Sequence, residues 1–253
     1  MKKTVVPRSM LKDFDCFVLE GVRKREWAEN KGYNHRREYS FYHPKFKMVR
    51  NPVVFLTQEE LFSLYRIDIP RYYPSAKMLT EVKDMFCFCC FTSLRYSDMI
   101  NLKTNNIKKD RIIITTQKTS DTLTIETNIY AKSILDRYLA GKKNGDNIFP
   151  QFTNSRMNLC LKTLGQMCGF NSPETIVYYK GRQRLEKTVP KWECLSTHCA
   201  RRTFICNALA SGVNAQTIMK WTGHSDYSAM KPYIDVTDED RAASMLKIFS
   251  PVI

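Results

Sequence analysis

The sequence predicts a mostly helical α+β fold that contains a small antiparallel sheet. Apolar residues recur at helical spacing along most of the chain, and two β-branched segments flank a polar turn near its middle. The chain has 253 residues, of which 43% are hydrophobic. That length and composition are enough for a sizeable core, in one large domain or in two smaller ones.

The N-terminal part predicts one amphipathic helix over residues 9–31, followed by a linker. Leu11, Phe14 and Val18 fall at helical spacing, and the next stretch, GYNHRREYSFYHPKFKMVRNP, is rich in basic and aromatic residues. A single helix cannot bury its own apolar side. We therefore expect residues 1–50 to need a partner and to be the tail of a domain whose earlier part is absent.

Two helices are expected next. Residues 57–66, TQEELFSLYR, begin with a capping box between Thr57 and Glu60. A longer helix over about 76–92 contains the apolar run MFCFCCF, so we expect it to be deeply buried. The stretch LRYSDMINLK follows, with a second helix start at its serine or aspartate, so Arg95 is expected at a junction between helices.

A β-hairpin is expected in RIIITTQKTSDTLTIET. Strands over about 111–116 and 122–127 flank the turn region QKTSD, and Lys118 lies at its edge. Helices should follow at about 129–140 and 155–168. The segment ETIVYYKGRQRLEKTVPKWECLS predicts a second hairpin that turns at KGRQ.

The segment THCARRTFICNALASG predicts a helix that directs an arginine toward the core. Ser196 or Thr197 can cap this helix, and Gly212 can end it. His198 and Arg201 are three residues apart and therefore share a face. An inward arginine is costly unless an anionic group meets it. That group could be a buried Asp or Glu, or a ligand such as a phosphate.

The C-terminal part continues the helical pattern. The stretch NAQTIMKWTGHSD predicts a short helix and a turn at Gly223 and His224, and Tyr233 comes nine residues after His224. A last amphipathic helix is expected over about 238–249. The apolar side of such a helix could dock on a neighbouring subunit or on its own core.

The charge of the chain favours a polyanionic partner. Its 40 Lys and Arg against 25 Asp and Glu give a formal charge of +15, which favours DNA, RNA or an anionic membrane surface. No apolar run is long enough to span a bilayer. The nine cysteines are scattered, as is typical of free thiols, and neither they nor the four histidines show zinc-ligand spacing. We therefore expect a cytoplasmic chain without a metal.

Six polar residues at helix ends and turns suit the chemistry of a phosphodiester. They are Arg95, Lys118, His198, Arg201, His224 and Tyr233. Guanidinium groups hold phosphate oxygens through paired hydrogen bonds and stay charged. They also stabilise the extra negative charge of a pentacoordinate transition state.

In order and spacing, this set resembles the active-site motifs of the tyrosine recombinase (phage integrase) family. The matching stretches are TSLRYSD with Arg95, QKT with Lys118, HCAR with His198 and Arg201, and GHSDYSAMKPY with His224 and Tyr233. The amino-acid sequences of these motifs are similar to those of integrases of conjugative transposons and related mobile elements. The resemblance implies a tyrosine recombinase catalytic domain over residues 51–253, preceded over 1–50 by the last helix and linker of a truncated core-binding domain.

The resemblance also implies a reaction. Tyr233 would attack the scissile phosphate and form a 3′-phosphotyrosyl bond, while Arg95 and Arg201 hold the phosphate. Covalent capture conserves the phosphodiester energy, so no ATP is needed. No metal or other cofactor is expected, because the arginines supply the charge. Tyr227 is the nearest rival nucleophile, but it lies only three residues past His224 and fits the family register poorly.

The remaining roles also follow from the resemblance. Lys118 would protonate the leaving 5′-oxygen, His198 would act as base toward the tyrosine, and His224 would donate a hydrogen bond to a phosphate oxygen. Two residues depart from the family pattern: Ser93 replaces the usual glycine before the first arginine, and Arg202 stands where many members have a second histidine.

The implied partner is double-stranded DNA, with a homotetramer on paired DNA sites, accessory DNA-bending proteins as further partners, and no membrane. Three alternatives stay open at this point. The stretch ALASGVNAQTIMKWTGHSD resembles a helix-turn-helix, so the chain could be a DNA-binding regulator. It could also be a truncated relative that binds DNA without exchanging strands, or a topoisomerase of the tyrosine type.

Overall fold

The computed structural model describes residues 52–117, 121–180 and 183–237. These residues fall into two units, one built from residues 53–174 together with 189–237 and the other from the hairpin residues Thr175–Thr188. The first unit contains the predicted site residues that the structure describes. Its fold is mostly helical with a small antiparallel sheet, as predicted.

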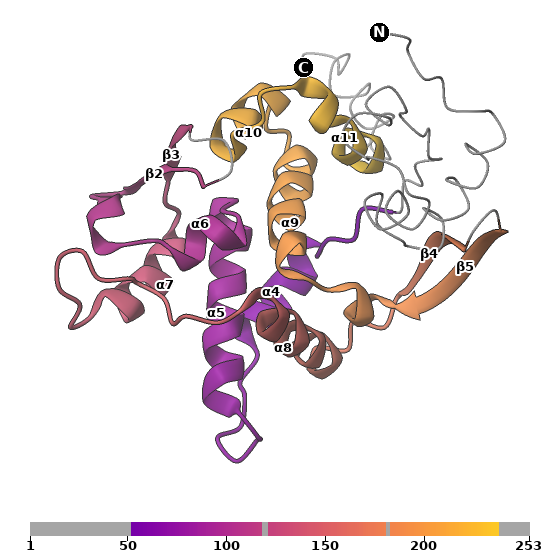
Figure 1. The fold of residues 1–253 in the computed structure, drawn as a ribbon, viewed down its shortest axis with the longest axis horizontal. Coiled ribbons are helices and arrows are strands. Elements are labelled where there is room, and N and C mark those ends of the chain that lie inside the picture. The colour runs from indigo at the N-terminus through magenta and orange to yellow at the C-terminus, as the bar shows by residue number, and fades with distance from the viewer. Residues whose placement is uncertain (1–51, 118–120, 181–182, 238–253) are drawn as a thin grey trace, which may run out of the picture. The chain divides into compact units, whose positions relative to one another are not determined.

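The helices of the described residues follow the order expected from the sequence (Figure 1). They are α4 (Gln58–Arg66), α5 (Ala76–Thr92), α6 (Tyr96–Ile100), α7 (Ile129–Leu139), α8 (Asn154–Met167), α9 (Thr197–Ala210), α10 (Ala215–Thr222) and α11 (Lys231–Thr237). Short 3-10 turns are η1 (Thr104–Asn106), η2 (Lys191–Cys194) and η3 (Tyr227–Ala229). The capping box at Thr57 is confirmed, with both of its hydrogen bonds present.

Helix α5 is the centre of the larger unit. All of its residues from Val82 to Thr92 are buried, as expected for a helix surrounded by others. It packs against α4, α7, α8 and α9, and Figure 1 shows α9 beside its C-terminal half. The ring of Phe88 lies 4.9 Å from that of Phe149. The expectation of a deeply buried helix over 76–92 is confirmed.

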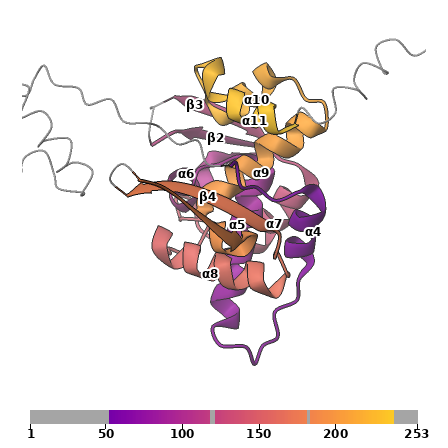
Figure 2. The same cartoon turned by 90° about the vertical axis from the view of Figure 1, so that its right-hand side faces the viewer.

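The small sheet has three antiparallel strands in the order β1–β2–β3. Strands β2 (Arg111–Thr115) and β3 (Thr122–Glu126) alternate exposed and buried residues, so one face of the pair lies on the core. Strand β1 (Ile107–Lys108) was not predicted, because two residues are too few to show an alternation. In Figures 1 and 2, β3 lies beside α10, which contacts it.

The second predicted hairpin is also present. Strands β4 (Pro173–Lys180) and β5 (Gln183–Pro190) form a two-stranded sheet. The hydroxyl oxygens of Thr175 and Thr188 lie 3.3 Å apart across it. The predicted turn at KGRQ falls at the described ends of these strands, and residues 181–182 lie outside the described residues.

The C-terminal helices hold the catalytic candidates. Helix α9 begins after Ser196, as predicted, and Gly212 follows its end with a left-handed φ of 81°. Helix α11 was not predicted, because it is short and lacks a repeating apolar pattern. The predicted helices over 9–31 and 238–249 lie outside the described residues. None of the described helices has the length and apolarity needed to cross a bilayer.

Gly165 of α8 marks a close approach between this helix and the η2 turn that leads into α9. A Cβ at this position would lie 2.7 Å from Leu195 Cδ1 and 2.8 Å from Trp192 Cβ. We expect Gly165→Ala to lower the free energy of unfolding by about 1–3 kcal/mol, because overpacking outweighs the roughly 1 kcal/mol gain in helix propensity. Urea unfolding measures the change. Gln166→Ala, at an exposed neighbour, should change it by under about 0.5 kcal/mol, and equal values for the two variants would contradict the prediction.

Candidate active site

Arg201 is the buried centre of the site. Its side chain lies in the second turn of α9, and the residue is 3% exposed. Nη1 donates a hydrogen bond to the Ser93 carbonyl oxygen at 3.1 Å, and Nη2 donates one to the Thr222 carbonyl oxygen. Among the described residues no carboxylate forms an ion pair with it. Within the described residues the arginine is therefore held by backbone carbonyls, and the nearby charge of Asp98 acts on it without forming an ion pair.

Arg95 brings a second guanidinium to the same place. It precedes α6 in the N-cap position, and its Nη1 atom lies 3.8 Å from Asp98 Oδ2. That Nη1 atom is buried, and it has no hydrogen-bond partner in the part of the chain that the structure describes. Burial and the neighbouring charge of Arg95 lower the pKa of Arg201 to about 10. Arg201 thus stays cationic at neutral pH, and the two guanidiniums are close enough to repel each other.

Asp98 is a member of the site that the sequence analysis did not single out. It is 5% exposed, and its Oδ1 atom accepts a hydrogen bond from the backbone N–H of Gln117 at 3.0 Å. Asp98 therefore joins Arg95 to the end of the β2–β3 hairpin, one residue before Lys118. Its position three residues after Arg95, on a short helix, was the available sequence signal. Lys118 itself lies outside the described residues.

His224 lies against Arg201. Gly223 ends α10 with a left-handed φ of 62° and turns the chain so that His224 Nε2 is 3.3 Å from Arg201 Nη2. The other ring nitrogen, Nδ1, is 2.9 Å from the Thr222 hydroxyl oxygen. Burial and the charges of Arg201, Arg95 and His198 lower the pKa of His224 to about 4. The imidazole is therefore neutral at pH 7.

Tyr233 lies on α11, half-buried, where it packs against the small cluster of Ile205, Ile218 and Met230. Burial raises the pKa of its phenol, and the positive charges of Arg202 and Arg201 oppose that shift, the former also through a side-chain hydrogen bond. The phenol thus belongs to the same electrostatic environment as the buried arginine. Arg202, noted only as a departure from the family pattern, contacts the predicted nucleophile.

His198 begins α9 and is exposed. Its charge contributes to the lowered pKa of His224, so it belongs to the edge of the same group. Of the six predicted residues, the structure brings Arg95, Arg201, His224 and Tyr233 together, and it places His198 at their rim.

Ser93 explains why a glycine is usual before the first arginine. Its φ is 62°, in the left-handed region that glycine enters most easily. Its carbonyl oxygen accepts the Arg201 hydrogen bond, and its hydroxyl donates to the Trp221 carbonyl oxygen at 3.1 Å. The departure therefore falls on a residue that contacts the site, and the hydroxyl adds a contact to α10 that glycine cannot make.

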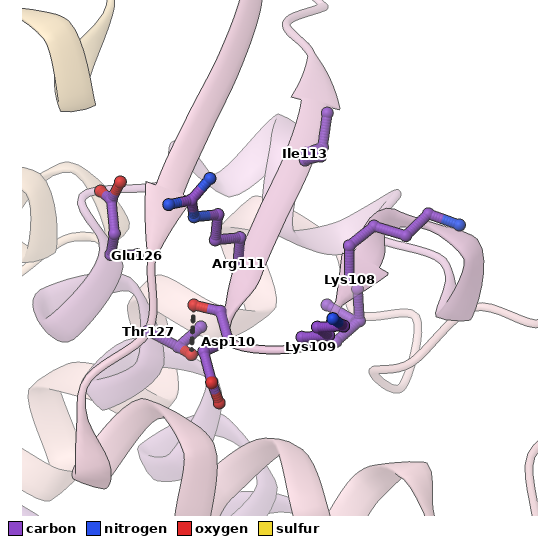
Figure 3. A pocket seen from close by; sticks show the side chains of 8 residues that line it. Lys108, Lys109, Asp110, Arg111, Ile113, Glu126 and Thr127 are labelled. Carbon is purple, nitrogen blue, oxygen red and sulfur yellow. Dashed lines mark hydrogen bonds between the residues drawn. The ribbon is translucent and has the colours of Figure 1, made fainter.

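A basic hollow lies elsewhere on the sheet. Figure 3 shows Lys108, Lys109 and Arg111 around it, where β1 turns into β2 and β3 ends. Because β2 and β3 are antiparallel, this end is opposite the turn that contains Lys118. Its carboxylates are already bonded, Asp110 to Lys132 and Glu126 to Trp221. None of the five predicted residues that the structure describes lines this hollow.

The fold described above is that of tyrosine recombinase catalytic domains. The chain belongs to the phage integrase family, whose sequence model matches residues 55–240. That match runs from α4 through the C-terminal helices, so the helix-turn-helix interpretation of α9 and α10 is not favoured. It also confirms the resemblance stated on the sequence motifs.

Relatives and solved structures agree with this placement. The tyrosine recombinase XerA of Saccharolobus solfataricus is 23% identical over 204 residues, which are 80% of this chain and 62% of that protein. The chain thus spans less than two thirds of the length of this relative. Two solved complexes have similar folds, each at 15% identity. The Tn1549 transposon integrase with circular intermediate DNA gives a TM-score of 0.57 (97% of this chain, 86% of that one). The XerH recombinase bound to palindromic difH substrate in a post-cleavage complex gives 0.61 (96% and 73%).

Strain at Ser93 can be measured with a matched pair of substitutions. Ser93→Ala and Ser93→Gly both remove the hydroxyl bond to Trp221, but only glycine relieves the left-handed backbone. We expect the glycine variant to unfold with a free energy about 1 kcal/mol higher than the alanine variant. Urea denaturation of both proteins tests this. An alanine variant as stable as the glycine variant would show that φ at this position is not strained.

His224 should make the folded protein less stable at acidic pH. Its pKa is lowered from 6.5 to about 4 in the folded state, so between these values the unfolded chain binds a proton that the folded protein does not. The contribution of neutral His224 to the free energy of unfolding is therefore fully present above about pH 6.5 and is lost as the pH falls toward 4. Urea unfolding of wild type and His224→Gln from pH 7 to pH 4 measures it. Wild type should lose stability relative to the variant, and a constant difference would contradict the lowered pKa.

Proposed function

We propose that this chain is a site-specific DNA recombinase that breaks and rejoins DNA through a 3′-phosphotyrosyl intermediate. One observation carries the proposal: two guanidiniums, Arg95 and Arg201, lie together with a neutral imidazole and a tyrosine, and no carboxylate in the described part of the chain forms an ion pair with the buried arginine. Buried cations without a paired anion are costly. An anionic ligand removes that cost, and the basic charge of the chain favours DNA as its source.

The arginines would bind the scissile phosphate. Arg95 Nη1 has no hydrogen-bond partner among the described residues, and a phosphate oxygen would supply one. Arg201 uses three of its five N–H donors on Ser93, Thr222 and His224. The two remaining donors can contact a second oxygen. Guanidiniums fixed in this way are most useful in the transition state, when the phosphorus carries an additional negative charge.

Tyr233 would be the nucleophile, and its proton must be removed. Its pKa is raised, so well under about a thousandth of the phenol is ionised at pH 7. His198 would take the proton as the phenol oxygen forms its bond to phosphorus. The bond from phosphorus to the 5′-oxygen then breaks, and Lys118 would give that oxygen a proton. Attack by a 5′-hydroxyl of a second strand reverses these steps and restores the phosphodiester.

Strand exchange requires two DNA sites, and we propose a homotetramer on paired sites, with DNA-bending proteins as accessory partners. The relatives support DNA as the substrate, since the solved complexes of Tn1549 integrase and XerH contain DNA. Residues 1–50, proposed as part of a core-binding domain, would add further contacts to the DNA. A protein that binds DNA without exchanging strands remains the alternative that the following experiment separates.

The covalent intermediate provides a direct test. The full chain is incubated with 5′-labelled duplexes of randomised sequence, each nicked near the cleavage site so that the short 5′-hydroxyl fragment diffuses away. We expect wild type to give a labelled protein–DNA adduct that survives denaturing gels, and Tyr233→Phe to give none, because phenylalanine has no nucleophilic oxygen.

Tyr227→Phe is the matched control. Tyr227 is 56% exposed and lies on η3, outside the group around Arg201, so its loss should leave the adduct in place. Loss of the adduct in Tyr227→Phe but not in Tyr233→Phe would identify Tyr227, and not Tyr233, as the nucleophile. Gel-shift binding of the same duplexes by wild type without any adduct would favour the alternative of a DNA-binding relative.

A further inference from the structure

Thr222 contacts two members of the candidate site at once. It is the last residue of α10 and is 0% exposed. Its carbonyl oxygen accepts a hydrogen bond from Arg201 Nη2. Its hydroxyl oxygen lies 2.9 Å from His224 Nδ1 and 2.7 Å from the Ile218 carbonyl oxygen. A residue bonded to both an arginine and a histidine of the site can control how each is oriented.

The hydroxyl contacts determine where the imidazole proton lies. The carbonyl oxygen of Ile218 can only accept a hydrogen bond, so it takes the single hydroxyl proton of Thr222. A weaker contact to the Met219 carbonyl oxygen, at 3.3 Å, agrees with that direction. The hydroxyl oxygen must then accept from His224, which means that Nδ1 carries the proton. In a neutral imidazole the other nitrogen, Nε2, is left with a lone pair.

The contact of the other ring nitrogen, Nε2, independently indicates the same Nδ1–H tautomer. His224 Nε2 lies 3.3 Å from Arg201 Nη2, and a guanidinium nitrogen can only donate. Nε2 must therefore accept, which requires the tautomer that the Thr222 hydroxyl selects. One hydrogen of Nη2 goes to the Thr222 carbonyl oxygen and the other is directed at His224. The threonine thus orients the guanidinium directly through its backbone and indirectly through the histidine.

We propose that Thr222 is a positioning residue that holds His224 in the Nδ1–H tautomer, with the Nε2 lone pair directed at Arg201. This inference rests on the proposed function for its relevance to DNA cleavage, but the tautomer is a property of the protein alone. It gives His224 a role that the sequence did not suggest, which is to accept a hydrogen bond from Arg201. The arginine is then oriented before a phosphate arrives, and its two unused donors are kept available.

The tautomer can be measured without DNA. In protein labelled with 15N-histidine, wild type at pH 7 should show a protonated Nδ1 and a bare Nε2 for His224, assigned by its loss in His224→Gln. Thr222→Val keeps the size of the side chain but removes the hydroxyl acceptor, so only Arg201 still favours the Nδ1–H form and part of the His224 population should become protonated at Nε2. Thr222→Ser keeps the hydroxyl and should restore the wild-type pattern. A protonated Nε2 in wild type, or an unchanged pattern in the valine variant, overturns the proposal.

Two further measurements separate positioning from loss of stability and from the proposed function. Thr80 makes the same bond to the carbonyl oxygen four residues earlier, but it lies near the start of α5. Thr80→Val should change neither the His224 signals nor adduct formation. Thr222→Val should slow adduct formation about 10- to 100-fold, with serine rescue and little change in DNA binding. If wild type forms no adduct, the proposed function fails while the nitrogen spectra still decide the tautomer. Cleavage in Thr222→Val at the wild-type rate would exclude a positioning role.

Discussion

The arrangement of this domain depends on a single buried guanidinium. Arg201 reaches from α9 to the carbonyl at the end of α5, on Ser93, and to the carbonyl at the end of α10, on Thr222. Carbonyl groups at helix C-termini lack partners within their helices, and they carry partial negative charge. The arginine satisfies two such groups and is held in place by them. The ends of α5 and α10 are distant in sequence but close in space. Without a cation between them, their buried carbonyl oxygens would lack hydrogen-bond donors.

The same arrangement brings like charges together in the site. Burial and the mutual repulsion of the cationic groups lower the pKa values of Arg201 and His224. Asp98 offsets part of this charge, but its closest approach to Arg95 is 3.8 Å. A site of this kind is stabilised by an anion that makes contact with both cations. Functional sites often give up local stability in this way, and the rest of the fold must compensate for it.

The compensation comes from a rigid framework around α5. This helix is buried from Val82 to Thr92 and packs against four others, and Gly165 lies in close contact with the turn that leads into α9. The hairpin is tied to the site through Asp98 and Gln117, while Trp221 of α10 donates to Glu126 of β3 at 2.8 Å. Residues from α6, α9, α10 and the sheet are therefore held at fixed positions, which a reaction at a single phosphate requires.

The sequence by itself determined the helices, the hairpins, the family, and the residue types that suit a phosphodiester. Those features are local, since caps, apolar periods and motif spacings are set by residues close together in the chain. It could not reveal α11 around Tyr233, which is too short to show a period, or the contact of Arg202 with that tyrosine. Only the tertiary structure decided that Arg201 is held by the carbonyls of Ser93 and Thr222 rather than by a carboxylate. Those partners lie 108 and 21 residues away along the chain, and backbone carbonyls are present at every position, so no pattern of side chains can identify which ones a buried arginine will meet.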